Sequence, residues 1–272
     1  MQQLSRQWQA QGRTIAVVPT MGALHDGHLS LIKKAREYAD KVVVTLFVNP
    51  TQFGAGEDLN NYPRTFENDC KICENEGTAA IFFPSAAEMY AADSSTWVNE
   101  EKVSQGFCAA ARPTHFRGVT SVVTKLFNAV LPHVAVFGEK DYQQLQVLRR
   151  MVRDLNFPIE VIGAAIYREA SGLAMSSRNR YLSDEERQSA SIIYKSLQEV
   201  RQKLTSKSIS LAEARDFIKK EITAVGGVVD YVETVNAENL QKSDECSARI
   251  RCLIAAHFGQ ARLLDNMDIY RD

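Results

Sequence analysis

The chain has no apolar run long enough to cross a membrane and no surplus of charge of either sign. Its 272 residues include 32 Lys and Arg against 33 Asp and Glu, a formal net charge of −1. Residues 1–11 are polar and do not have the positive-then-apolar pattern of a signal peptide. We therefore expect a cytoplasmic protein. Because acidic and basic residues are interspersed, we expect neither nucleic acid nor a membrane as a partner.

Cysteine is scarce, and its odd number argues against a disulfide framework. The chain has five cysteines, whereas secreted disulfide scaffolds carry even sets. Cys70 and Cys73 form a CxxC motif, but they fall in a helical pattern and no second pair follows. We interpret both as core residues and not as a redox or zinc site, and Cys108, Cys246 and Cys252 likewise.

Short β-rich runs alternate with helical patterns along the first part of the chain. The expected strands are 15–18, 42–48, 79–83, 134–137 and 159–162, and the expected helices are 29–38, 66–76, 119–130 and 142–155. Such a βαβ series predicts an α/β fold with a Rossmann-like, doubly wound parallel sheet. Ligands of these sheets bind at the carboxyl ends of the strands.

The pattern changes in the last hundred residues. Two S-x-x-E capping boxes, beginning at Ser183 and Ser210, predict helix starts. Runs 228–235 and 249–258 have strand character and predict a small antiparallel sheet packed on helices. We therefore expect two domains, residues 1–165 and a smaller α+β domain of residues 166–272, and find no repeat or low-complexity tract.

Two histidines three residues apart, His25 and His28, stand where a strand gives way to a helix. Gly22 and Gly27 let the backbone approach a ligand, and the helix starting near Asp26 directs free N–H groups at it. The pattern predicts a nucleotide phosphate site. Two alternatives remain open: a zinc site, although no nearby Cys or Glu completes a ligand set, and two histidines that merely satisfy a turn.

The run His25–His28 resembles the HxGH signature of the nucleotidyltransferase and class I synthetase superfamily. That superfamily's other mark is a late KMSKS-type loop, which residues 174–180 (AMSSRNR) resemble. The loop's hydroxyl groups and guanidinium suit the leaving pyrophosphate, although Arg178 stands where related loops often have lysine.

Five motifs in register narrow the resemblance to the pantothenate synthetases, or pantoate–β-alanine ligases. They are 19–22 (PTMG), 47–53 (FVNPTQF), 62–65 (YPRT), 115–119 (HFRGV) and 137–144 (FGEKDYQQ). The resemblance is strong from about Thr14 to Tyr181 and weaker over 229–266. It implies that ATP and pantoate form pantoyl adenylate with release of pyrophosphate, and that β-alanine then attacks to give pantothenate and AMP.

The resemblance also implies roles for residues. Residues 1–165 would bind ATP and pantoate, residues 166–272 would be lid-like, and the enzyme would be a homodimer. The catalytic residues would be His25, His28, Lys140 and Arg178. The ATP-binding residues would be Met21, Gly22, Ala23, Leu24, His25, Asp26, Gly27, His28, Gly138, Glu139, Lys140, Asp141, Tyr167, Met175, Ser176, Ser177 and Arg178. The pantoate-binding residues would be Pro19, Thr20, Met21, Gln52 and Gln144.

Some positions leave alternatives open. Magnesium is expected with ATP, and Asp69 is its candidate ligand, although Asn68 replaces an acid found beside it in some relatives and Asp69 also fits a solvated helix acid. Arg112 lies in a segment that resembles a loop near ATP, or is a surface arginine. Tyr167 stands where relatives commonly carry a small aliphatic residue at the adenine.

Two other functions compete with the ligase. The HxGH motif alone also permits a nucleotidyltransferase such as a pantetheine-phosphate adenylyltransferase, which leaves AMP joined to a stable product. A nucleotide-binding regulatory module would bind ATP without forming AMP. Gln52, residues 138–141 and Gln144 together favour the ligase.

Overall fold

The computed structural model describes residues 1–54, 57 and 59–270, which form two compact units. The first unit comprises residues 1–139 and 143–165, and the second comprises residues 140–142 and the chain from Ile166 onward. Lys140–Tyr142 therefore group with the later part of the chain, although both flanking segments belong to the first unit. That residues 1–165 bind ATP and pantoate and that residues 166–272 act as a lid remain predictions.

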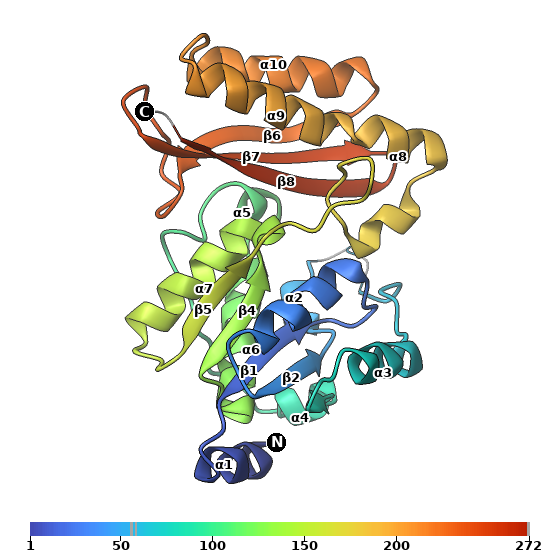
Figure 1. Ribbon diagram of the computed structural model, residues 1–272, viewed down its shortest axis with the longest axis vertical. Coiled ribbons are helices and arrows are strands. Elements are labelled where there is room, and N and C mark those ends of the chain that lie inside the picture. Colours follow the sequence, from blue (N-terminus) through green and yellow to red (C-terminus); the bar gives the residue numbers. More distant parts are fainter. Residues whose placement is uncertain (55–56, 58, 271–272) are drawn as a thin grey trace. The chain divides into compact units, whose positions relative to one another are not determined.

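A five-stranded parallel sheet forms the centre of the first unit. Its strands are β1 (Ile15–Thr20), β2 (Lys41–Leu46), β3 (Ala80–Phe82), β4 (Val134–Gly138) and β5 (Glu160–Ala164), in the order β3-β2-β1-β4-β5. The sheet is drawn in blue to yellow-green in Figure 1. This sheet confirms the expected α/β class. Its valine-rich strands, such as residues 42–44, are buried because helices cover both faces of the sheet.

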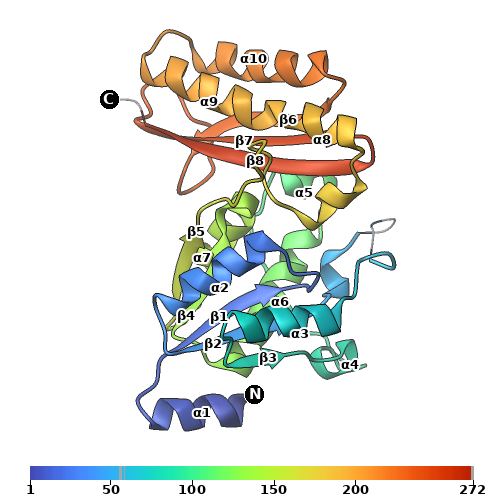
Figure 2. The same ribbon diagram turned by 45° about the vertical axis from the view of Figure 1, so that its right-hand side comes forward.

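Helices cover both faces of this sheet, as Figures 1 and 2 show. The helices along this part of the chain are α1 (Gln2–Ala10), α2 (Asp26–Arg36), α3 (Phe66–Asn75), α4 (Ala86–Met89), α5 (Cys108–Ala111), α6 (His115–Val130) and α7 (Tyr142–Asp154), with 3-10 turns η1 (Pro50–Gln52) and η2 (Glu139–Asp141). Helix α1 was not expected, and α6 begins four residues before the expected start at 119. No helix in the described part of the chain combines the length and hydrophobicity needed to span a membrane.

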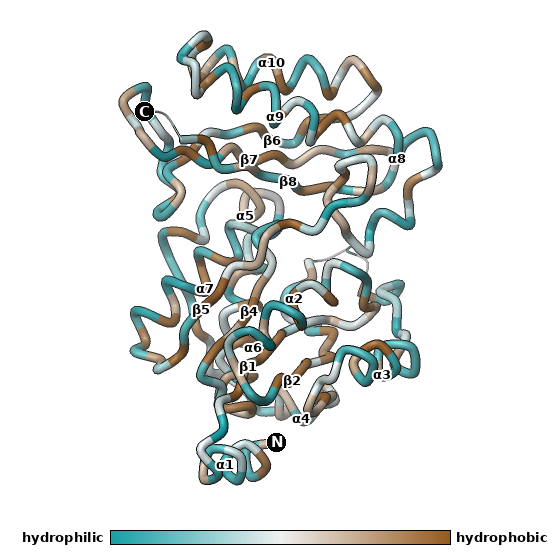
Figure 3. The backbone as a smooth tube through the Cα atoms, in the orientation of Figure 1, coloured by the Kyte–Doolittle hydropathy of each residue, from teal (hydrophilic) through white to brown (hydrophobic). Residues whose placement is uncertain are grey.

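The core of the first unit lies between the sheet and these helices. Val18 and Val44 of the sheet are fully buried and share one cluster with Leu24, Ile32 and other apolar residues. Figure 3 shows the hydrophobic colour concentrated along β1 and β2. Each fully buried aliphatic side chain contributes about 1.5–3 kcal/mol, so the strand that precedes the HxGH run is held rigidly.

The second unit packs helices on one face of a small antiparallel sheet. Its helices are α8 (Asp184–Ala190), α9 (Ile192–Thr205) and α10 (Leu211–Ala224), preceded by the 3-10 turn η3 (Ser177–Tyr181), and its strands are β6 (Val228–Asn236), β7 (Arg249–Phe258) and β8 (Ala261–Tyr270). The order is β6-β7-β8, with α9 and α10 on one face of the sheet in Figure 2. Both capping boxes form as expected, at Ser183 and Ser210. The third strand, β8, was not expected.

All five cysteines are free thiols, and Cys108 and Cys252 are buried as expected, but Cys246 is exposed, so its expected place in the core was wrong. Cys73 is buried on α3 and Cys70 is half-buried, so the CxxC motif belongs to a packed helix. Burial raises the pKa of the Cys73 thiol to about 11. A protonated, buried thiol is a core group and not a redox nucleophile.

Candidate active site

The sequence motifs follow the carboxyl ends of three neighbouring strands. Strands β2, β1 and β4 lie side by side in the sheet. Thr20 ends β1 and leads into the HxGH run, β2 leads to the turn that contains Gln52, and Gly138 ends β4. Parallel strands have their carboxyl ends at the same edge, which is where ligands of such sheets bind.

A strained turn connects β1 to α2. The Thr20 hydroxyl donates to the Thr45 carbonyl (2.8 Å) and accepts a hydrogen bond from the N–H of Gly22 (3.2 Å). Gly22 and Ala23 both have positive φ, +83° and +52°, which costs energy for a residue with a Cβ. Glycine is required at position 22 because a Cβ there would also lie 3.1 Å from Asp69 Oδ2.

Asp69 of α3 holds this turn in place. Its carboxylate accepts hydrogen bonds from the N–H groups of Ala23 (2.9 Å) and Leu24 (2.8 Å), and from the Thr65 hydroxyl (3.1 Å). The residue is only 2% exposed. Because one carboxylate accepts from two successive backbone N–H groups, it fixes the conformation of the loop.

These contacts bear on the predicted role of Asp69 as a magnesium ligand. Both Asp69 oxygens are directed at N–H donors, and no group of three or more His, Cys, Asp or Glu side chains suited to a metal occurs within residues 1–54, 57 and 59–270. Magnesium binding at Asp69 remains an untested prediction, and the contacts support a structural role instead. The same absence of a ligand cluster counts against the zinc alternative at the two histidines.

His25 and His28 lie together at the start of α2. His25 is the N-cap residue, and its backbone N–H donates to His28 Nδ1 (3.3 Å). The ring centroids are 4.0 Å apart. An accepting Nδ1 places the proton of neutral His28 on Nε2. His28 therefore offers a ring N–H donor beside the positive end of the α2 dipole, which favours an anion.

Gln52 is positioned by Asn49. The Gln52 side chain donates through Nε2 to the Met21 sulfur (3.1 Å) and accepts through Oε1 from Asn49 Nδ2 (3.1 Å). Asn49 is 1% exposed, and its Oδ1 accepts from the Tyr90 hydroxyl (2.8 Å). Asn49 was not singled out from the sequence, although an Asn-Pro pair at a helix start is an N-cap signal.

Arg112 is not an isolated surface arginine. Its guanidinium donates to both oxygens of Glu57 (2.6 and 2.5 Å) and to the Gln52 carbonyl (3.2 Å). His115 Nδ1 lies 2.9 Å from the same carbonyl. Burial opposes ionisation of Glu57, but Arg112 outweighs it and the pKa of Glu57 is lowered. The Arg112 segment is thus brought to the Gln52 turn.

Gln144 and its neighbour Gln143 have different environments in the first turn of α7. Gln144 is half-buried. Gln143 is 5% exposed and donates to the carbonyls of Val103 (3.1 Å) and Gln105 (3.1 Å), while it accepts from the N–H of Cys108 (3.1 Å). Gln143 therefore fixes the loop before α5. No local pattern separates these two glutamines in the sequence.

The second unit contains the other predicted phosphate-binding residues. Lys140 Nζ lies 3.5 Å from Asp141 Oδ1. A hairpin of residues 167–175 leads into the KMSKS-like loop of residues 174–180, here called the clamp segment: the N–H of Met175 donates to the Tyr167 carbonyl (2.9 Å). The Tyr167 side chain is 43% exposed. Ser176 then caps η3, because its hydroxyl accepts from the N–H of Arg178 (3.3 Å).

Glu169 stabilises the clamp segment. Its carboxylate accepts from Asn179 Nδ2 (2.7 Å) and from Arg187 Nε and Nη2 (2.9 and 2.8 Å). Asn179 Nδ2 also donates to the Ala174 carbonyl (3.1 Å). Burial opposes the charge on Glu169, but the hydrogen bonds from Arg187 and Asn179 prevail and lower its pKa.

Comparison with known proteins gives one consistent family. The model of the pantoate-beta-alanine ligase family matches residues 1–268. The pantothenate synthetase of Geotalea daltonii is 50% identical over 270 residues, covering 98% of this chain and 95% of that protein. The one from Heliobacterium modesticaldum is 48% identical over 264 residues, covering 97% and 94%.

Solved structures agree. The pantothenate synthetase of Thermus thermophilus superposes with a TM-score of 0.91 at 44% identity and covers 94% of each chain. The pantoate-beta-alanine ligase of Francisella tularensis, solved with beta-gamma ATP and beta-alanine, has a TM-score of 0.80 at 31% identity, covering 98% of this chain and 94% of that one. The chain therefore belongs to the pantoate–β-alanine ligase family, the pantothenate synthetases.

Proposed function

We propose that this protein condenses pantoate with β-alanine to form pantothenate, with pantoyl adenylate as the intermediate and with AMP and pyrophosphate as products. The observation that carries the proposal is the family match over residues 1–268. It is supported by an intact HxGH turn whose backbone and histidines are held as an anion site requires.

Adenylation makes the pantoate acid reactive. A free carboxylate resists attack by an amine because of its negative charge, whereas a mixed anhydride with AMP carries a good leaving group. The pantoate oxygen attacks the α-phosphorus and pyrophosphate leaves, so negative charge builds on the phosphate oxygens. The N-terminus of α2 and the Nε2–H of His28 stabilise that charge by hydrogen bonding, without a proton transfer.

Gln52 is suited to hold pantoate. Its Nε2 donates to the Met21 sulfur, which is a weak acceptor, so exchange for a ligand oxygen costs little. Gln144 would supply a second neutral amide, and Pro19, Thr20 and Met21 would line the same subsite. Neutral amides bind the acid without neutralising the charge that makes its oxygen a nucleophile.

The second unit would contribute cations and hydroxyl groups to the phosphates. Lys140 is a compact charge suited to a phosphate, and Arg178 with Ser176 and Ser177 can hold the departing pyrophosphate. Tyr167 would contact adenine, and a contact through its backbone would tolerate the departure from the small aliphatic residue that relatives commonly carry. Magnesium would enter with ATP as part of the co-substrate.

The two competing functions are not favoured. A pantetheine-phosphate adenylyltransferase would share the HxGH turn, but the family match extends over both units of this chain. A regulatory module would not need Gln52, Lys140 and Arg178 together. The homodimer and the cytoplasmic location remain predictions, the first of which light scattering would test.

Product analysis tests the proposal. Purified protein is incubated with Mg-ATP, pantoate and β-alanine, and each acid is omitted in turn before mass spectrometry. We expect pantothenate and AMP only when both acids are present. A stable adenylylated product would indicate the nucleotidyltransferase, and unconsumed ATP would indicate the regulatory module.

His28→Ala tests the charge-stabilising role. Loss of one preorganised donor costs about 10²–10³ in rate, so we expect adenylation to fall by that factor while the free energy of unfolding changes little. His257→Ala on β7, a half-buried histidine in the second unit, is the control. Equal effects on rate and stability would contradict the assignment.

A further inference from the structure

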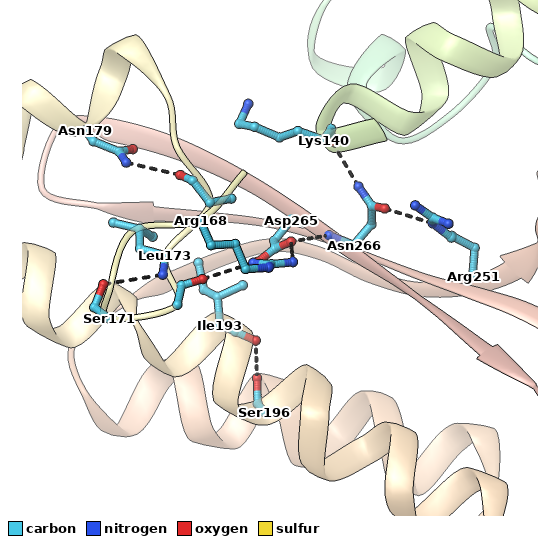
Figure 4. Close-up of polar contacts among 12 residues, drawn as sticks. Lys140, Arg168, Ser171, Leu173, Asn179, Ile193, Ser196, Arg251, Asp265 and Asn266 are labelled. Carbon is cyan, nitrogen blue, oxygen red and sulfur yellow. Dashed lines mark hydrogen bonds and ion pairs between the residues drawn. The ribbon is translucent and has the colours of Figure 1, made fainter. Parts of the chain in front are cut away.

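Two consecutive polar residues are buried in the middle of β8. Asp265 is 4% exposed and Asn266 is 3% exposed. Consecutive strand residues point to opposite faces of a sheet, so the pair makes contacts on both sides of β8. Figure 4 shows these contacts, all of which lie within the second unit.

Asp265 holds the hairpin that precedes the clamp segment. Arg168 donates to both carboxylate oxygens, at 2.6 and 2.8 Å, and also to the Gly172 carbonyl at 3.0 Å. The Arg168 guanidinium stacks on Tyr194 at 3.9 Å. Burial raises the pKa of Asp265, and the bidentate bonds from Arg168 oppose that rise. The hairpin of residues 167–175 is thereby fixed to β8 by its own arginine.

Asn266 holds the backbone of Lys140. Its Nδ2 donates to the Lys140 carbonyl (2.9 Å), and its Oδ1 accepts from Arg251 Nε (2.8 Å). The amide orientation is determined, because Arg251 can only donate and a carbonyl can only accept. Arg251 is itself fixed by Asp268 (2.8 Å) and by stacking on Tyr142 (3.8 Å). In Figure 4 the Lys140 side chain extends away from Asn266.

The two residues are also linked to each other. The N–H of Asn266 donates to Asp265 Oδ1 at 2.7 Å. One short stretch of β8 therefore fixes the backbone at Lys140 and the hairpin that leads to Arg178. A protein is often as stable with well-packed apolar residues at buried ionic positions as with the ionic residues themselves. Stability alone therefore does not explain why two polar residues stand between the apolar Leu263 and Met267.

We propose that Asp265 and Asn266 are positioning residues for the adenylation step, through Lys140 and the Met175–Arg178 segment. The inference rests on the proposed function, in which those residues bind the phosphates of ATP. It predicts that disturbing the pair slows the transfer of the adenylyl group from ATP to pantoate, with release of pyrophosphate, without an equal loss in the attack of β-alanine on preformed pantoyl adenylate.

Asn266→Asp is the sharpest test. The carboxylate still accepts from Arg251 and keeps the side-chain volume, but it has no donor for the Lys140 carbonyl. Asp265→Asn is the second variant, since it removes one acceptor from Arg168. The control is Asp230→Asn, which weakens an ion pair with Arg262 (2.9 and 2.6 Å) in the same sheet, beside Tyr231.

Two half-reactions are measured for each folded variant. The first is pantoate-dependent exchange of labelled pyrophosphate into ATP, and the second is conversion of supplied pantoyl adenylate and β-alanine to pantothenate. Misplacement by about 1 Å can cost 10²-fold, so we expect exchange to fall about 10- to 100-fold for Asn266→Asp, with the second half-reaction nearly unchanged.

The results separate the two proposals. If the wild type shows no pantoate-dependent exchange, the proposed function fails and this inference fails with it. If the wild type is active but Asn266→Asp and Asp265→Asn behave like Asp230→Asn, only the positioning role is wrong. Equal losses in both half-reactions would also overturn it, because general damage to the unit would explain them.

Discussion

Replacing Asp69 tests whether its carboxylate holds the loop in shape or binds magnesium. The Asp69 carboxylate accepts from the N–H groups of Ala23 and Leu24. Asp69→Asn keeps one oxygen and replaces the other with an NH₂ group, which must face a backbone N–H. Two donors then oppose each other at a site that is 2% exposed.

The expected cost follows from these contacts. A hydrogen bond to a charged group contributes about 1.5–3 kcal/mol, and an unsatisfied buried donor costs about 1–3 kcal/mol. The remaining oxygen can still accept one of the two N–H groups. We therefore expect Asp69→Asn to lower the free energy of unfolding of the first unit by about 3 kcal/mol, with or without magnesium.

Urea unfolding followed by tryptophan fluorescence measures this change. Both tryptophans, Trp8 and Trp97, lie in the first unit, so their signal reports on the unit that contains Asp69. The matched control is Glu67→Gln, which removes the same charge from the first turn of α3 at an exposed position. We expect the control to stay within about 0.5 kcal/mol of the wild type.

A different result would refute the reasoning. If Asp69→Asn unfolds like the wild type in the absence of metal, but needs much more magnesium for activity, then the carboxylate is a metal ligand and its backbone contacts contribute little. If Glu67→Gln has the same effect as Asp69→Asn, the helix charge and not the loop contact is responsible.

Three further predictions concern other parts of the molecule. Gly118→Ala should lower the free energy of unfolding of the first unit by about 1–3 kcal/mol, although alanine usually favours a helix, because the new Cβ would lie 2.8 Å from the Gln52 nitrogen; an unchanged urea midpoint would contradict this. The pKa of Glu169 is lowered in the folded protein. The pairing of Glu169 with Arg187 should therefore stabilise the second unit at pH values above the unfolded-state pKa of Glu169, and this stabilisation should be lost as the pH falls through the lower folded-state pKa. Glu169→Gln should make the free energy of unfolding less dependent on pH in this acid range, as measured by circular dichroism. Burial raises the pKa of Cys252 to about 12, so a thiol reagent at pH 8 should label exposed Cys246 in the native protein and leave Cys252 unlabelled until it unfolds.

The parallel sheet was readable from the sequence because its strands are continuous apolar runs. Residues 15–18 and 42–46 have no competing pattern, and all are buried or nearly so. Strand β8 was missed for the opposite reason. Asp265 and Asn266 interrupt its hydrophobic alternation, and their burial is possible only because Arg168 and Arg251 supply partners from distant positions. Local patterns carry no information about such partners.

The predicted site likewise has some parts that local sequence patterns reveal and others that depend on distant residues. The neighbourhood of His25 and His28 follows from local rules, since a strand, a tight turn and a helix start are adjacent in sequence. The contacts that fix that turn come from Asp69, which is more than forty residues away along the chain, and those that fix Gln52 come from Asn49 and Tyr90. The chemistry was therefore predictable, whereas the residues that hold it in place were visible only in the folded chain.

Oxygen transfer from pantoate to AMP tests the central claim most directly. The wild-type protein is given Mg-ATP, β-alanine and pantoate labelled with ¹⁸O in its carboxylate, and the products are analysed by mass spectrometry. In the proposed route the attacking pantoate oxygen becomes the bridging oxygen of the anhydride and leaves with AMP when the amine attacks carbon. We therefore predict one ¹⁸O atom in AMP and none in pyrophosphate. Unlabelled AMP formed together with pantothenate would contradict the adenylate route.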